Sequence, residues 1–193
     1  MSQFDIVAIG TSAGGLKALT EVLSNLPKDF PVPILIVQHL DPRHKSLMAE
    51  ILQRHSDMNI KEAEDGEDIK NSTVYIAPPN RHMLTTDKKI ELTKTEFVHF
   101  SRPSIDLLFD SVAADYKDRA IAVILTGSGM DGAIGIKAIK ENGGTTIAQD
   151  SRTSEYFSMP DTAIKTGSID FILPLNEIAG ALVKLVTIEP GEQ

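Results

Sequence analysis

Near its beginning the chain carries the stretch Phe4-Asp5-Ile6-Val7-Ala8-Ile9-Gly10-Thr11-Ser12-Ala13-Gly14-Gly15-Leu16. An apolar run suited to a buried strand leads into a glycine-flanked serine, and a pattern typical of a helix follows. Residues 10–14 match Gly-x-Ser-x-Gly, in which glycines permit a tight turn and the serine hydroxyl projects from it. The stretch therefore predicts strand, turn and helix, and it makes Ser12 a candidate nucleophile.

A glycine-rich turn after a first strand can also bind phosphate. The dinucleotide fingerprint Gly-x-Gly-x-x-Gly is absent, because its second glycine would fall on Ser12. A P-loop is absent too, because it would need Lys and then Ser or Thr after Gly15, where this chain has Leu16. An α/β-hydrolase carries its elbow after several strands, whereas Ser12 follows the first. Two function classes stay open at this point: serine catalysis, and a non-catalytic α/β module that binds phosphate or a nucleotide.

The composition is that of one globular domain without cysteine chemistry. With 193 residues, 41% of them apolar and no long apolar segment, we expect a single domain over residues 1–193. The absence of cysteine excludes disulfides, thiolate metal sites and thiol catalysis. The net charge of −8 argues against binding to nucleic acid or anionic membranes. The first residues lack signal-peptide features, so the expected location is cytoplasmic.

Short apolar runs alternate with helical patterns along the chain, which predicts an α/β fold. We expect a doubly wound, mostly parallel sheet with helices on both faces. The polar middle section, residues 60–99, is expected to contribute a small β-hairpin insertion or edge strands. Strands are expected at residues 5–9, 34–38, 74–77, 120–125, 145–148 and 169–173. Helices are expected at residues 16–26, 46–54, 104–116, 133–142, 162–166 and 177–186.

Polar residues follow three of the most apolar runs. Ser12 follows the first, His39 the second, and Asp131 the run at residues 120–125. If these strands are parallel neighbours, the three side chains meet at one sheet edge as nucleophile, general base and orienting acid. Each also has a plainer interpretation, since His39 could bond to backbone at a strand end and Asp131 could cap the helix expected at residue 133.

The other histidines, His44, His55, His82 and His99, have no comparable position, and structural or surface roles fit them better. No pair of histidines has the i, i+4 spacing with an intervening acid that helical zinc sites use. We therefore expect neither a metal nor an organic cofactor.

Six ordered motifs resemble the catalytic domain of the chemotaxis protein-glutamate methylesterase family, CheB. The resemblance spans about residues 5–185. The motifs are Gly10-Thr11-Ser12-Ala13-Gly14-Gly15, Gln38-His39-Leu40-Asp41-Pro42, Ile76-Ala77-Pro78-Pro79-Asn80, Arg102-Pro103-Ser104-Ile105-Asp106, Leu125-Thr126-Gly127-Ser128-Gly129-Met130-Asp131-Gly132 and Met159-Pro160.

The resemblance implies a serine hydrolase that removes methyl groups from glutamate side chains on chemoreceptor helices and releases methanol, with deamidation of receptor glutamines as a related activity. By motif position the family's triad falls on Ser12, His39 and Asp131. The implied oxyanion donors are the backbone N–H groups near Ala13 and Ser128. Ala13 stands where chemotaxis members often have threonine, and Ser128 replaces a methionine, but a backbone donor survives either change.

The resemblance also raises the questions of regulation and of substrate approach. The first strand begins near Asp5, so we expect a stand-alone form without the phosphoacceptor domain, regulated through a separate methyltransferase or another partner. Because receptor methylation regions are acidic helices, a protein of net charge −8 needs a locally positive rim to approach them. Arg43 and Lys45, which follow the His39 motif, are the expected rim residues.

Overall fold

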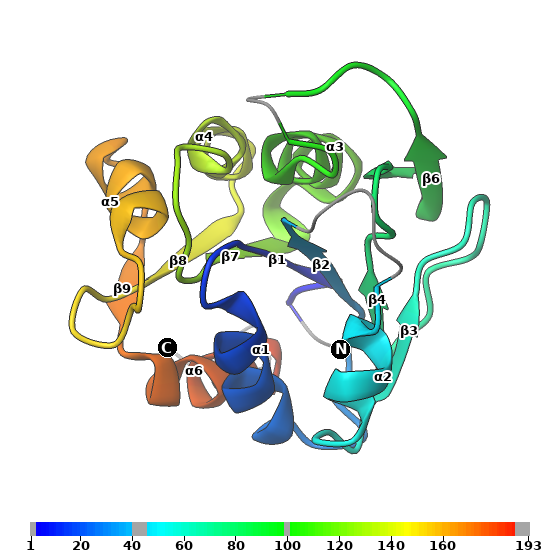
Figure 1. Cartoon of the computed structure of the whole chain (residues 1–193), viewed down its shortest axis with the longest axis horizontal. Coiled ribbons are helices and arrows are strands. Elements are labelled where there is room, and N and C mark those ends of the chain that lie inside the picture. The colour runs from blue at the N-terminus through cyan, green and yellow to red at the C-terminus, as the bar shows by residue number, and fades with distance from the viewer. Residues whose placement is uncertain (1–2, 40–45, 99–100, 188–193) are drawn as a thin grey trace.

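The computed structural model describes residues 3–39, 46–98 and 101–187. Seven strands form one parallel sheet in the order β3-β4-β2-β1-β7-β8-β9, and β5 and β6 form a separate antiparallel hairpin (Figure 1). The strands are β1 Ile6–Thr11, β2 Ile34–Gln38, β3 Asn59–Glu62, β4 Thr73–Ile76, β5 His82–Thr86, β6 Lys89–Thr93, β7 Ala120–Ile124, β8 Thr145–Gln149 and β9 Phe171–Leu173. The helices are α1 Gly15–Ser24, α2 Met48–Gln53, α3 Ile105–Tyr116, the 3₁₀ helix η1 Lys117–Arg119, α4 Ala133–Glu141, α5 Ser158–Lys165 and α6 Leu175–Thr187.

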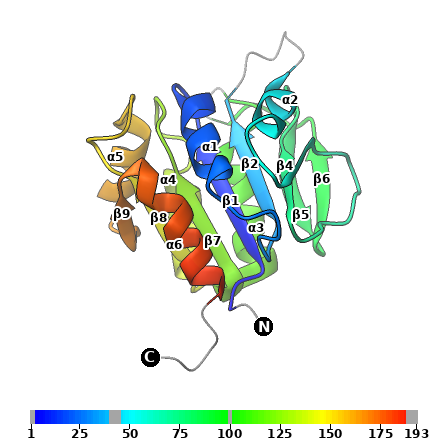
Figure 2. The same ribbon diagram turned by 90° about the horizontal axis from the view of Figure 1, so that it is seen from below.

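Helices cover both faces of the sheet (Figures 1 and 2). On one face α1, α2 and α6 bury Leu19, Leu52 and Leu182 against it. On the other face, α3, α4, α5 and the hairpin pack around residues such as Phe109 and Ile136. Burial of apolar surface on both sides explains why the central strands are apolar at almost every position rather than at alternate positions.

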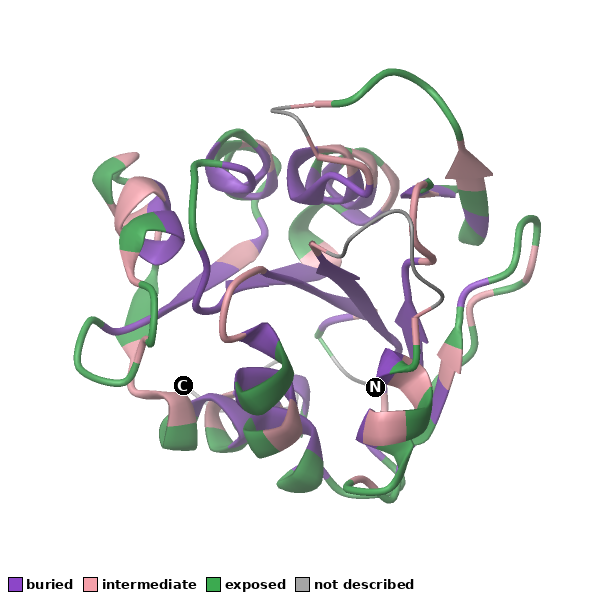
Figure 3. Cartoon of the chain, in the orientation of Figure 1, coloured by how far each residue is buried: buried purple, intermediate pink, exposed green. Residues whose placement is uncertain are grey.

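Every residue of β1, β2 and β7 is buried, and Figure 3 shows the centre of the sheet enclosed by helices. β1 pairs with β2 on one side and with β7 on the other, all in parallel. The carboxyl ends of these three neighbouring strands therefore lie side by side, so the loops that follow them can meet.

The expected fold class, with its hairpin, is confirmed. The middle section also supplies an edge strand, the other possibility that its pattern offered, because β3 lies at the sheet edge beside β4. The expectation that a helix starts at residue 162 was wrong, because α5 starts at Ser158 and holds Pro160 in its first turn. Proline fits there, since the first-turn N–H groups have no partner inside the helix. Within the described ranges, none of the helices has both the length and the hydropathy needed to cross a membrane.

Candidate active site

Ser12, His39 and Asp131 meet at the carboxyl edge of the sheet, in the loops that follow β1, β2 and β7. The β1–β2 ladder continues one step past the strands, because the His39 N–H donates to the Thr11 carbonyl at 3.2 Å. The Ser12 N–H donates to the Thr126 carbonyl of the β7 loop at 3.1 Å. These backbone bonds fix the positions from which the side chains extend.

The turn after Ser12 depends on its glycines. Gly14 is the N-cap of α1 and has φ of 78°, in the left-handed region that glycine enters without a Cβ penalty. The Gly15 N–H donates to the Ser12 carbonyl at 2.9 Å, which closes the turn. The chain thus passes from β1 into α1 within three residues and leaves the serine side chain at the start of the helix.

A chain of two hydrogen bonds joins the three side chains. Ser12 Oγ lies 3.2 Å from His39 Nδ1, and His39 Nε2 lies 2.7 Å from Asp131 Oδ2. A carboxylate only accepts hydrogen bonds, so Nε2 carries the proton of the neutral imidazole and Nδ1 is the free base that faces the serine hydroxyl. This assignment of the two ring nitrogens is opposite to that of the serine-protease triad, in which Nε2 faces the serine.

Asp131 is only 3% exposed, and every hydrogen bond that it receives comes from a donor that favours its negative charge. Besides His39, it accepts from the backbone N–H of Ile105 at 2.7 Å, the backbone N–H of Asp106 at 2.9 Å and Ser104 Oγ at 3.2 Å. Burial alone would raise the pKa of Asp131, but the hydrogen bonds from His39, Asp106 and Ile105 outweigh it and lower that pKa below its ordinary value. The carboxylate is therefore ionised at neutral pH.

Asp131 caps a different helix from the one its sequence position suggested. The N-cap of α4 is Gly132, which makes no side-chain cap, and the Asp131 carboxylate instead receives the first N–H groups of α3. In exchange, Asp106 Oδ1 in the first turn of α3 accepts from the N–H groups of Gly132 at 2.9 Å and Gly135 at 2.8 Å, at the start of α4. The two carboxylates thus satisfy the N-terminus of each other's helix, which fixes the loop that carries Asp131.

Two backbone N–H groups in the loops after β1 and β7 have no acceptor among the described residues. The N–H of Ala13, directly after Ser12, and the N–H of Ser128 donate to no acceptor within residues 3–39, 46–98 and 101–187. The β7 loop passes so close to Ser12 that a Cβ on Gly127 would lie 2.9 Å from the Ser12 Cβ. The β7 loop therefore lies directly against Ser12 at Gly127.

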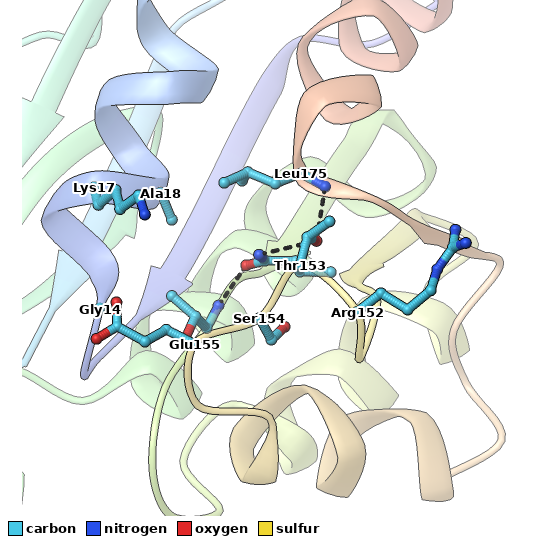
Figure 4. Close-up of a pocket in the computed structure, with 10 residues that line it drawn as sticks. Gly14, Lys17, Ala18, Arg152, Thr153, Ser154, Glu155 and Leu175 are labelled. Carbon is cyan, nitrogen blue, oxygen red and sulfur yellow. Dashed lines mark hydrogen bonds between the residues drawn. The ribbon is translucent and has the colours of Figure 1, made fainter.

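Two pockets open beside Ser12. A cleft of about 710 Å³ is lined by Ser12, Ala13, Gln38, His39 and Met48 together with the first turn of α1. A second pocket of about 400 Å³ shares Gly14 and Lys17 with it and lies between α1 and the loop at residues 150–155 (Figure 4). The polar floor of the second pocket is internally bonded, because Gln149 donates to Thr153 and the Leu175 N–H donates to the same hydroxyl. Of the two, only the first cleft is lined by Ser12.

The histidines outside the triad have structural or surface positions where they are described. His82 is fully buried, accepts from the Ser104 N–H at 3.1 Å and lies 2.8 Å from the Glu96 carbonyl. His55 is exposed near the end of α2. His44 and His99 lie outside the described residues, as do the expected rim residues Arg43 and Lys45. In the part of the chain that is described, no group of three histidine or acidic side chains is placed to hold a metal ion.

Comparison with known proteins decides the family. The profile of the CheB methylesterase family matches residues 7–182. The chain belongs to the CheB methylesterase family. Ser12, His39 and Asp131 all lie within the matched region, and membership in this family favours a hydrolase over the phosphate-binding module that the glycine turn had left open.

Relatives in the CheB family share the sequence over almost the whole chain. A provisionally named protein-glutamate methylesterase/protein-glutamine glutaminase of Leptospira interrogans is 45% identical over 183 residues, which cover 94% of this chain and 95% of that protein. The protein-glutamate methylesterase/protein-glutamine glutaminase of Thermotoga maritima is 42% identical, and the match covers 94% of this chain but 54% of that protein. The crystal structure of the Thermotoga maritima CheB methylesterase catalytic domain superimposes with a TM-score of 0.91, covering 95% of this chain and 99% of that one.

The sequence predicted that Ser12, His39 and Asp131 would meet, as the structure shows, but it did not predict the residues that hold them. Asp106, Ser104 and Gln38 stood inside the quoted motifs without an assigned role. Gln38 bonds to Ser12, Ser104 to Asp131 and Asp106 to Gly132. Each of these contacts joins positions 26 or 27 apart in the chain, so local patterns contain no signal for them.

Proposed function

We propose that this protein hydrolyses the methyl esters of glutamate side chains on chemoreceptors, releasing methanol, and that it deamidates receptor glutamines at the same site. The proposal rests chiefly on the continuous hydrogen-bonded series Ser12 Oγ, His39 Nδ1, His39 Nε2 and Asp131 Oδ2 at the mouth of an open cleft. Membership in the CheB methylesterase family and the names of its relatives support the substrate class.

In the first half of the reaction, His39 Nδ1 takes the Ser12 proton while Oγ attacks the ester carbonyl carbon. The negative charge that develops on the carbonyl oxygen is stabilised by the N–H groups of Ala13 and Ser128. Asp131 stabilises the imidazolium through Nε2. The carbon–oxygen bond to the methoxy group then breaks, and His39 donates its proton to the leaving group, so that methanol departs and a glutamyl ester of Ser12 remains.

In the second half, His39 Nδ1 takes a proton from water, and the hydroxide attacks the glutamyl ester. The tetrahedral intermediate collapses, Ser12 recovers its proton from His39, and the glutamic acid side chain is released and loses its remaining proton to solvent. With a glutamine substrate the same steps release ammonia in place of methanol. The oxyanion donors act in both halves because each passes through a tetrahedral intermediate.

The substrate is a side chain of another protein, so the rim of the cleft matters. Met130 and Ile134, on the loop and helix beside Asp131, are 57% and 56% exposed and offer apolar contact to a receptor helix. Arg43 and Lys45 remain our proposed source of positive charge at this rim. We further propose that residues 1–193 act as one catalytic domain in the cytoplasm.

The test is methanol release from a methylated receptor fragment by wild-type protein and by Ser12→Ala. We expect turnover by the wild type and none by the variant, with the melting temperature (Tm) almost unchanged, because the substitution only removes a hydroxyl that contacts His39. Equal turnover by both proteins would eliminate Ser12 as the nucleophile. Stabilisation by a phosphate compound, without reaction with esters or fluorophosphonates, would favour the binding module instead.

A further inference from the structure

Gln38 links the backbones of the nucleophile and the base. It is the last residue of β2, and its side chain is almost completely buried, with 6% of the residue exposed. Its Nε2 donates to the Ser12 carbonyl at 2.7 Å and to the His39 carbonyl at 3.1 Å. One side-chain amide therefore connects the two loops whose side chains must meet for proton transfer.

The Ser12 carbonyl belongs to the same peptide unit as the Ala13 N–H. In a planar trans peptide the N–H points opposite to the C=O, so a constraint on the carbonyl also sets the direction of the N–H. The carbonyl is held by Gln38 Nε2 at 2.7 Å and by the Gly15 N–H at 2.9 Å. A carbonyl that accepts hydrogen bonds also makes its own N–H a stronger donor, because successive bonds polarise one another.

The surroundings of Gln38 indicate that its side-chain NH₂ group, and not its oxygen, makes the contacts that matter at this site. Its Oε1 is buried and accepts no hydrogen bond in the described portion of the chain. A Cβ at Gly15 would overlap this oxygen, so the second glycine of the Gly14-Gly15 pair makes room for the amide. A buried acceptor left unsatisfied costs about 1–3 kcal/mol, so we expect a compensating benefit from the two donated hydrogen bonds.

We propose that Gln38 is a positioning residue for the oxyanion site: it orients the Ser12–Ala13 peptide so that the Ala13 N–H points at the developing negative charge. This inference rests on the proposed function, because it concerns the same ester carbonyl. Loss of a whole oxyanion donor costs about 10²–10³ in kcat in other serine hydrolases. Misdirection of a donor that is still present costs less, and we expect a fall in kcat of about 10–100-fold.

Gln38→Met is the decisive variant, and Gln53→Met is its matched control. Gln53, at the end of α2, makes a similar bridge: its Nε2 donates to the carbonyls of Ser56 at 3.1 Å and Met58 at 2.9 Å. Both changes replace a bridging amide by an apolar side chain of similar length, but only the first acts on the Ser12 peptide. The measurements are kcat and KM for p-nitrophenyl acetate, the Tm, and the amide proton chemical shift of Ala13.

For Gln38→Met we expect the fall in kcat with KM within about threefold of wild type, since the interaction strengthens only in the transition state. The Ala13 amide proton should move upfield as its peptide loses polarisation. Gln53→Met should lower the Tm and leave kcat, KM and the Ala13 shift unchanged. If Gln38→Met does not fold, Gln38→Asn, which keeps an amide but is one methylene shorter, should show the same fall in kcat.

The inference is overturned if a folded Gln38 variant keeps the kcat of wild type. It is also overturned if Gln38→Met and Gln53→Met lower the Tm to a similar extent and lower kcat to a similar extent. An unchanged Ala13 amide shift would also overturn it. Failure of the proposed function is recognised separately, because the wild-type protein would then hydrolyse neither p-nitrophenyl acetate nor methylated receptor.

Discussion

Replacement of Asp131 by asparagine tests two roles of this carboxylate together: it accepts the first N–H groups of α3, and its charge stabilises the His39 imidazolium. Four donors face its two oxygens: His39 Nε2, the N–H groups of Ile105 and Asp106, and Ser104 Oγ. Asparagine keeps one oxygen, and in either orientation its NH₂ group faces a backbone N–H, that of Ile105 or that of Asp106. One such buried conflict costs about 1–3 kcal/mol. At about 2–4 °C per kcal/mol for a chain of this size, the Tm should fall by about 2–12 °C.

The effect on the rate should be much larger than the effect on stability. The asparagine side chain carries no charge to stabilise the imidazolium, and an NH₂ group turned toward His39 would move the imidazole proton to Nδ1, where it cannot receive the serine proton. The corresponding change in serine proteases lowers kcat by about 10⁴. Stopped methanol-release assays and calorimetry on the same preparation measure both quantities.

Asp170→Asn is the matched control for this substitution. Asp170 likewise accepts a backbone N–H, that of Thr146 at 3.0 Å, and it pairs with Lys140, but it lies at the opposite end of β8 from the site. The Asp170→Asn variant should have a lower Tm than wild type and the same kcat. If Asp131→Asn retained kcat within tenfold of wild type, the reasoning that gives the carboxylate an electrostatic role would be refuted.

Three further predictions concern stability and substrate approach. Because folding lowers the pKa of Asp131, the ionised carboxylate contributes its full stability above about pH 3.8, the ordinary pKa, and loses that contribution as the pH falls further. The Tm difference between wild type and Asp131→Asn should therefore shrink in melts below that pH. Asp106→Ala removes the acceptor for the first N–H groups of α4 and should lower the free energy of unfolding, measured by chemical denaturation, by about 1–2 kcal/mol. A decrease of less than about 0.5 kcal/mol would contradict the capping role of Asp106. Arg43→Glu with Lys45→Glu should lower the second-order rate on intact receptor, most strongly at low salt, and leave p-nitrophenyl acetate hydrolysis unchanged; equal losses on both substrates would exclude steering.

Much of the fold follows from patterns of neighbouring residues. The strand at Ile34–Gln38 was predicted with its observed bounds, and β7 at Ala120–Ile124 within one residue, because both are apolar at almost every position and polar residues follow them. The same patterns predicted that Ser12, His39 and Asp131 would converge, since parallel neighbouring strands end at one edge. Short-range periodicity thus predicted the architecture and the convergence of these three side chains.

The supporting contacts were beyond sequence reasoning because they join distant positions. For Asp131 the sequence offered, as the plainer alternative to an orienting acid, a cap on the helix that follows it. The structure instead shows Asp131 capping α3, and Asp106 capping α4 in return. That exchange depends on how two helices pack side by side, which no local pattern encodes. The choice of His39 nitrogen also depends on ring orientation, and the role of Gln38 depends on a turn 26 positions away.

The measurement that tests the central claim most directly is the site of covalent modification by a small fluorophosphonate, located by peptide mass spectrometry in wild type and in His39→Ala. If His39 Nδ1 activates the Ser12 hydroxyl, the phosphonyl adduct should be found on Ser12 in the wild type, and its rate of formation should fall by about 10²–10⁴ in His39→Ala, the usual contribution of a general base. Modification at another residue, or labelling of Ser12 at the same rate in both proteins, would contradict a Ser12–His39–Asp131 mechanism.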